Sequence, residues 1–134
     1  MSSDDLRQRI EAIETGYEFM LAYAAQGRQT DKGGGSGSKL REHLNAMAAA
    51  LDGLGAAALA AAGAVNRDLP KAGQAFFSAV ENDASVTLAA LRLVLARADI
   101  SSQLIDNLNA SIHLRALLTD LFVVDEALRP NASA

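Results

Sequence analysis

The sequence predicts an all-α protein, an antiparallel four-helix bundle that dimerises through its apolar helices. Apolar residues recur at helical spacing through most of the 134-residue chain, and no segment shows the alternation typical of a half-buried strand. The stretch 84–98 carries only two charges, Arg92 and Arg97, and is apolar on nearly every side. Such a helix must be buried all round, and a two-fold symmetric dimer is the usual cover for excess apolar surface. We therefore expect the dimer interface at Leu88, Leu91 and Leu95.

The first helix is expected over about 3–26, within a single domain that spans 1–134. Its apolar stripe advances in steps of four and three residues, and Gly27 is typical of a helix end. Gly16 lowers the helix propensity, which suggests that a neighbouring helix or a ligand approaches closely there. On the opposite face, three acidic residues are expected to lie in solvent: Glu11, Glu14 and Glu18.

The segment 28–38 is rich in Gly and Ser, a composition typical of a flexible connector. It is longer than most connections in helical bundles. A natural tether and an engineered linker are both compatible with it. The second helix is expected over about 39–63, with a stepped stripe of Leu, Met and Ala and a back composed mainly of Ala.

Two further helices complete the predicted bundle. The third is expected over about 70–98, with Pro70 in its first turn, where the missing N–H costs nothing. The fourth is expected over about 101–128, after a short turn whose polar residues suit helix caps. The apolar face of the fourth helix moves partway around its axis between the first and second halves.

Composition excludes several classes of function. The chain has no Cys, so disulfides, thiolate catalysis and thiolate metal sites are excluded. The net charge is −4 and the basic residues are scattered, which argues against a nucleic-acid partner. No apolar run reaches the roughly 20 residues of a membrane span. The acidic start of the chain is unlike a signal peptide, and we expect a cytoplasmic protein.

No cofactor and no metal site is predicted. A di-iron site in a bundle needs Glu-x-x-His pairs, but Leu40 and Ala110 stand three residues before the two histidines, His43 and His113. The segment GGGSGSKL lacks the residues and the preceding strand of a phosphate-binding loop. The best polar group is His113 with Asp106, Asn109 and Asp120 on the same side of the last helix, and His113 could serve there as a base or a phosphoacceptor.

These observations favour a non-enzymatic accessory, adaptor or regulatory module that acts through contact with a protein partner. One alternative is a sensory bundle that binds a small molecule in an apolar pocket between helices, with Tyr17, Tyr23 and Phe76 as candidate lining residues. A third hypothesis is an enzyme or phosphotransfer protein that uses His113. A homodimer is expected in the first case.

Overall fold

The computed structural model describes residues 2–35 and 37–129, apart from the side chains of Ser2, Ser3 and Ser38. This part of the chain is all-helical, which confirms the predicted class. Its helices are α1 (Ser2–Ala24), α2 (Gly37–Leu51), α3 (Leu54–Val65), α4 (Leu69–Ala72), α5 (Gln74–Leu95), α6 (Ser102–Asn109) and α7 (Ile112–Ala127). Residues 130–134, which the predicted domain 1–134 includes, lie outside the described part.

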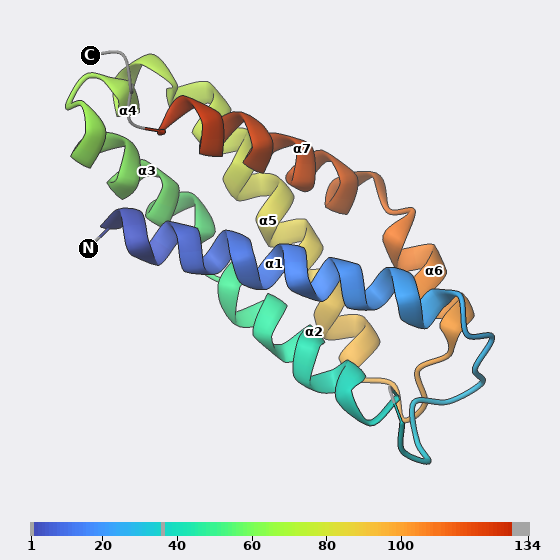
Figure 1. Ribbon diagram of the computed structural model, residues 1–134. Coiled ribbons are helices and arrows are strands. Elements are labelled where there is room, and N and C mark those ends of the chain that lie inside the picture. Colours follow the sequence, from blue (N-terminus) through green and yellow to red (C-terminus); the bar gives the residue numbers. More distant parts are fainter. Residues whose placement is uncertain (1, 36, 130–134) are drawn as a thin grey trace.

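The longer helices pack side by side around a core that runs the length of the molecule (Figure 1). α1 packs on α2, α3 and α6, and α5 packs on α2, α3 and α7. The core is aliphatic and rich in Leu, as the stepped stripes predict. The neighbour at Gly16 is α2, because a Cβ at this position would collide with the Met47 side chain.

Three of the predicted long helices are interrupted. α2 and α3 are separated at Gly53, whose φ of 81° lies in the left-handed region that favours glycine. The predicted third helix divides into α4 and α5 at Gly73, and the fourth divides into α6 and α7 at Ala110 and Ser111. Each break exposes backbone N–H and C=O groups that need new partners.

Side chains from neighbouring helices supply these partners at the break between α2 and α3. Arg9 of α1 donates to the carbonyl oxygens of Ala50 (3.1 Å) and Asp52 (2.6 Å) at the end of α2. Glu81 of α5 accepts a hydrogen bond from the Gly55 N–H (2.9 Å) at the start of α3. Both charges complement the helix ends that they contact, a positive charge at a C-terminus and a negative charge at an N-terminus.

Arg41 of α2 caps the C-terminal end of α5 in the same way. Its guanidinium donates to the carbonyl oxygens of Leu95 (2.9 Å) and Arg97 (2.7 Å). It also donates to the carboxylate of Asp31 (2.7 Å), which is buried and accepts a second hydrogen bond from the Ile100 N–H (2.9 Å). Asp31 thus ties the segment after α1 to α2 and to the end of α5.

Further hydrogen bonds involve the first residues of the segment after α1, ahead of its Gly- and Ser-rich part. Arg28 and Ser102 exchange two hydrogen bonds, and the Ser102 hydroxyl donates to the Tyr23 carbonyl oxygen (2.7 Å). The Arg28 guanidinium donates to backbone carbonyl oxygens of Thr30 and Lys32. Ser36 and the side chain of Ser38 lie outside the described residues.

The predicted dimer interface needs a correction. Leu88 and Leu91 are 7% and 0% exposed and belong to the core of the single chain. Leu95 is partly buried and packs against the same core. Because α2, α3 and α7 cover α5 within one chain, Leu88 and Leu91 leave almost no surface for a second copy.

Gly55 and Gly63, both in α3, should respond oppositely to replacement by Ala. A Cβ at Gly55 would lie 2.6 Å from the Glu81 Cβ, which the α5 backbone fixes, whereas at Gly63 the nearest atom is Pro70 Cγ at 3.6 Å. Gly55→Ala should destabilise the fold by about 1 kcal/mol or more, because overpacking outweighs the gain in helix propensity. Gly63→Ala should stabilise it by roughly 0.5–1 kcal/mol. Urea titrations followed by circular dichroism measure both, and equal effects would contradict the Gly55 contact.

Asp31→Asn should destabilise the fold by about 2 kcal/mol near neutral pH. Burial raises the pKa of the Asp31 carboxyl, but the hydrogen bonds from Arg41 and from Ile100 outweigh it and hold the pKa below its usual range. A lowered folded pKa means that the contribution is present above the pKa of about 4 of an unfolded Asp and is lost as the pH falls through the folded pKa. The difference between wild type and variant should therefore shrink at acidic pH. Asp106→Asn, at an exposed position, is the control.

Candidate functional site

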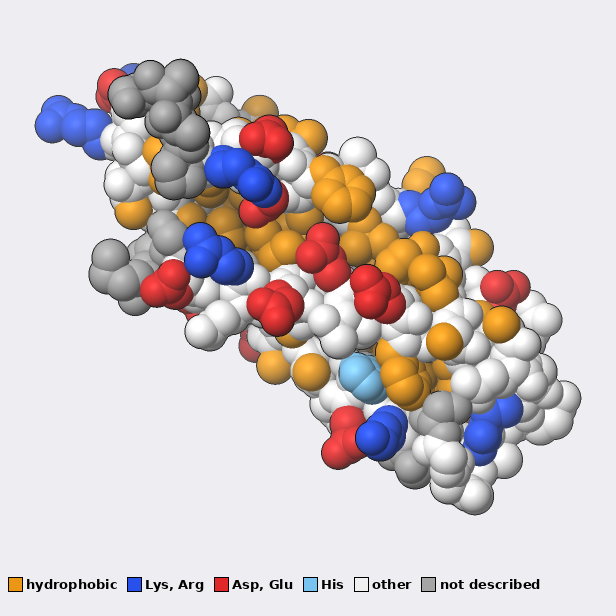
Figure 2. Space-filling view, in the orientation of Figure 1, with side chains coloured by type: hydrophobic (Ala, Val, Ile, Leu, Met, Phe, Trp, Pro, Cys, Tyr) orange, Lys and Arg blue, Asp and Glu red, His pale blue; other side chains and the backbone are white. Residues whose placement is uncertain are grey.

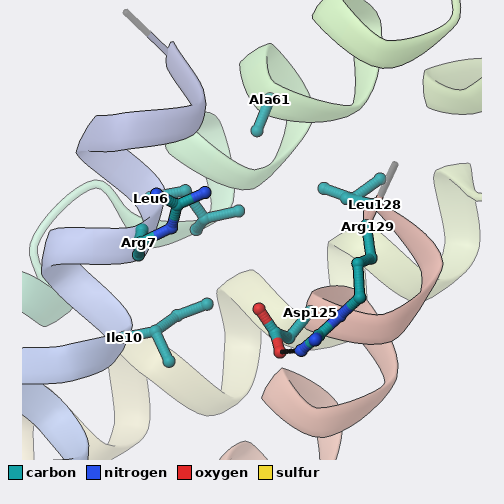
Figure 3. A pocket seen from close by; sticks show the side chains of 7 residues that line it. All are labelled: Leu6, Arg7, Ile10, Ala61, Asp125, Leu128 and Arg129. Carbon is teal, nitrogen blue, oxygen red and sulfur yellow. Dashed lines mark hydrogen bonds and ion pairs between the residues drawn. The ribbon is translucent and has the colours of Figure 1, made fainter. Parts of the chain in front are cut away.

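An open groove separates α1 from α7. α6 packs on α1, but α7 packs mainly on α5, since the break at Ala110 and Ser111 lets α7 change direction after α6. The part of the groove near the start of α1 is a depression of about 310 Å³ whose apolar lining includes Leu6, Ile10 and Leu128. Figure 3 shows these side chains facing one gap, with the Asp125–Arg129 ion pair (2.7 Å) on the α7 side.

A second depression, of about 520 Å³, lies between the same two helices toward the end of α1. Tyr17 and Leu21 of α1 face Leu118 and Phe122 of α7 across it. Leu21 is 47% exposed and Phe122 is 64% exposed, although both are large apolar side chains. We call the two depressions together the α1–α7 groove, defined by Leu6, Ile10, Tyr17 and Leu21 on one wall and Leu118, Phe122 and Leu128 on the other.

The groove has an apolar floor and charged edges. In Figure 2 apolar side chains form a band along the seam between α1 and α7, with acidic side chains beside it. Glu14 and Glu18 line the α1 edge, and Arg115 lines the α7 edge. Contiguous exposed apolar surface rimmed by polar residues is typical of an interaction site.

The structure does not bring Tyr17, Tyr23 and Phe76 together in one ligand pocket. Only Tyr17 lines the α1–α7 groove. Tyr23 is fully buried, and its hydroxyl donates to the Ile100 carbonyl oxygen (2.6 Å), so it has a structural role at the end of α1. Phe76 lies near the start of α5 and lines a separate apolar depression of about 250 Å³, with Phe77 and Val123 among its neighbours.

His113 has a different partner from the one that the sequence predicts. Its Nδ1 lies 3.7 Å from a carboxylate oxygen of Asp83 on α5, whereas no hydrogen bond or ion pair in the described part of the chain joins it to Asp106. Asp106 is exposed on α6. The other histidine, His43, stacks on Phe19 with ring centroids 4.2 Å apart.

Asp83 also faces Asp120 of α7, and the pKa of Asp120 is the most strongly perturbed in the described residues. Burial, followed by the hydrogen bond and the charge of Asp83, raises the pKa of Asp120 to about 7. Among the described residues, one carboxylate oxygen of Asp120 is buried without a hydrogen-bond partner, so protonation of Asp120 removes a charge that burial and the neighbouring Asp83 both disfavour. The pair lies between α5 and α7, and α7 has few other contacts to hold it.

The described residues offer no metal centre and no unbroken membrane span. Within residues 2–35 and 37–129, no group of three or more His, Asp or Glu side chains is arranged to hold a metal ion. No single helix there is long and apolar enough to cross a bilayer, and only the pair Lys39–Leu51 and Leu54–Val65, bent by 54°, passes by length and composition.

Sequence reasoning identified Tyr17 as a candidate pocket residue but missed the exposed residues opposite and beside it in the groove. Leu21 and Phe122 lie beside the main apolar stripes of their helices, which is the one signal that the sequence offers for them. Comparison of the chain with protein-family models, with curated proteins and with solved structures finds no match in any of the three. The groove and the carboxyl pair are therefore interpreted from their own geometry.

Asp120→Asn should stabilise the protein above pH 7. The raised folded pKa means that the protonated Asp120 contributes stability that is present below the unfolded pKa of about 4 and is lost as the pH rises through about 7. Asn is neutral throughout and can donate to Asp83. The melting temperature of the variant should exceed that of the wild type by about 3–6 °C at pH 8, and the difference should shrink toward pH 5.

Scanning calorimetry between pH 5 and pH 8 measures this difference. Asp106→Asn is the control, because this exposed carboxyl should give the same small effect at each pH. Parallel profiles for wild type and Asp120→Asn would contradict the raised pKa of Asp120.

Proposed function

We propose that this chain is a small accessory or adaptor module that acts by contact, with the α1–α7 groove as the surface that receives an amphipathic helix of a protein partner. The proposal includes a four-helix bundle. Its first and third members are α1 and α5, its second is α2 followed by α3, and its fourth is α6 followed by α7. In this bundle the seam between α1 and α7 is the open one. The observation that carries the proposal is the exposure of two large apolar side chains in that seam, Leu21 and Phe122, whereas Leu6 and Ile10 farther along it are buried.

The dimensions of the groove support a helix as the occupant. From Leu6 to Leu21 the α1 wall spans about 22 Å at 1.5 Å per residue, which is the length of a helix of about 15 residues. Helix-in-groove recognition places apolar side chains at helical spacing into an apolar groove between helices. A partner helix would bury Leu21 and Phe122 and so remove apolar surface from water.

The small-molecule alternative has one supporting observation, the apolar depression beside Phe76. Its volume of about 250 Å³ is below the roughly 300–1,000 Å³ of most ligand pockets, and it is open to solvent. The groove is longer and combines an apolar floor with charged edges, which suits a protein segment better than a small ligand.

Site-specific photo-crosslinking tests the proposal. A photoreactive residue at Leu21 or Phe122 should capture the same protein from an extract of the source cells. The same residue at Leu93, which is 73% exposed but lies outside the groove, should not capture it. Equal capture at all three positions, or no adduct at Leu21 and Phe122, would contradict the groove as the docking surface.

Light scattering on the purified chain decides whether a second copy is the occupant instead. We expect Phe122→Asp to leave the mass unchanged, because the side chain contacts solvent in the single chain and the partner is another protein. A dimer that Phe122→Asp dissociates, but Leu93→Asp does not, would assign the groove to a second copy and overturn the proposal.

A further inference from the structure

The two edges of the α1–α7 groove carry different charges. Glu11, Glu14 and Glu18 are exposed on α1, at the helical spacing that places them in one row. Glu14 and Glu18 line the groove, and Arg7, one turn before Glu11, lines its other depression. Glu11 therefore lies on the same edge, between residues that line the two depressions.

This acidic row has no basic partner within the described residues. No ion pair within 4.0 Å involves any of its three carboxylates. Opposite the row, Asp125 and Arg129 of the α7 edge neutralise each other at 2.7 Å. Arg115 is the positive charge that lines the α7 edge of the larger depression. The α1 edge thus carries three carboxylates and Arg7 and is net negative, whereas Arg115 leaves the α7 edge net positive.

We propose that the occupant of the groove is an amphipathic helix of a partner protein that carries Lys or Arg along the edge that meets α1. The inference rests on the proposed function and names the chemistry of the partner. Apolar residues at i, i+3, i+4 and i+7 fill the floor, and basic residues one or two turns apart pair with Glu11, Glu14 and Glu18. An acidic residue on the other edge of the partner meets Arg115.

The charges disfavour other occupants. A second copy of this chain also has a net charge of −4, so two copies repel each other overall. An anionic lipid surface or a nucleic acid would meet the same carboxylates, and like charges brought together at an interface are unfavourable. Complementary charge therefore selects a basic helix over these partners.

Three designed helical peptides of about 16 residues test the inference. They share one apolar face of Leu residues, and the edge that meets α1 carries Lys, Gln or Glu at matching positions. Binding to the full chain is measured by fluorescence polarisation. At low salt the Lys peptide should bind about tenfold more tightly than the Gln peptide, and the Glu peptide more weakly than either. The differences should shrink in 0.5 M salt, because these charges are exposed.

Charge reversal on the protein supplies the matched control. Replacing Glu11, Glu14 and Glu18 together by Lys should invert the order of the Lys and Glu peptides. The same change in net charge at Glu42, Asp68 and Asp106, which are exposed and line neither depression, should preserve the order. Inversion in both triple variants would show an effect of net charge alone and would overturn the inference.

The outcomes separate this inference from the proposed function. If all three peptides bind equally and Phe122→Asp abolishes their binding, the groove receives a helix, but the inference that this helix carries a basic edge is wrong. If the Gln peptide does not bind and Phe122→Asp leaves binding of the Lys peptide unchanged, the apolar groove is not the docking surface and both proposals fail.

Discussion

Charged side chains that cap the backbone ends of neighbouring helices hold this fold together. Arg9, Glu81 and Arg41 reach across from α1, α5 and α2 to helix ends whose backbone groups lack partners within their own helices. The arrangement stabilises charges as well as backbone groups, because each charge meets the end of a helix dipole of opposite sign. The Arg9 and Arg41 side chains keep 25% and 34% of their surface exposed, so the desolvation penalty is smaller than for a fully buried ion.

The core could be predicted from the sequence, but the caps could not. The stepped spacing from Leu6 to Met20 marks the buried face of α1, because side chains three and four residues apart share one side of a helix. Arg41 and Leu95 are 54 positions apart, and no local pattern links them. Composition does not reveal the contacts of the segment after α1, where Gly and Ser are typical of a flexible connector. There Asp31 and Ser102 fix the backbone through contacts that exist only in the folded chain.

The candidate site lies between α1 and α7, and the periodicity of apolar residues in the sequence does not reveal that these helices leave a groove. The sequence identifies Tyr17 and Leu21 as apolar residues of the first helix, yet whether a neighbouring helix covers them depends on the direction of α7. That direction changes at Ala110 and Ser111, where the sequence predicts one continuous helix. The row of glutamates was predicted to face solvent, and it does, but its position at the edge of an apolar groove follows only from the packing.

The caps and the groove are connected through rigidity. Arg9 fixes α1 to the α2–α3 break, and the hydrogen bonds among Tyr23, Arg28 and Ser102 fix the other end of α1 to α6. The α1 wall is therefore held at both ends before any partner binds. A preformed wall reduces the ordering entropy that binding must overcome, so more of the apolar burial at Leu21 appears as affinity. The α7 wall is held mainly by α5, with the Asp83–Asp120 pair between them. Changes in the width of the groove should therefore come from movement of α7, because Asp83 and ionised Asp120 repel each other above neutral pH.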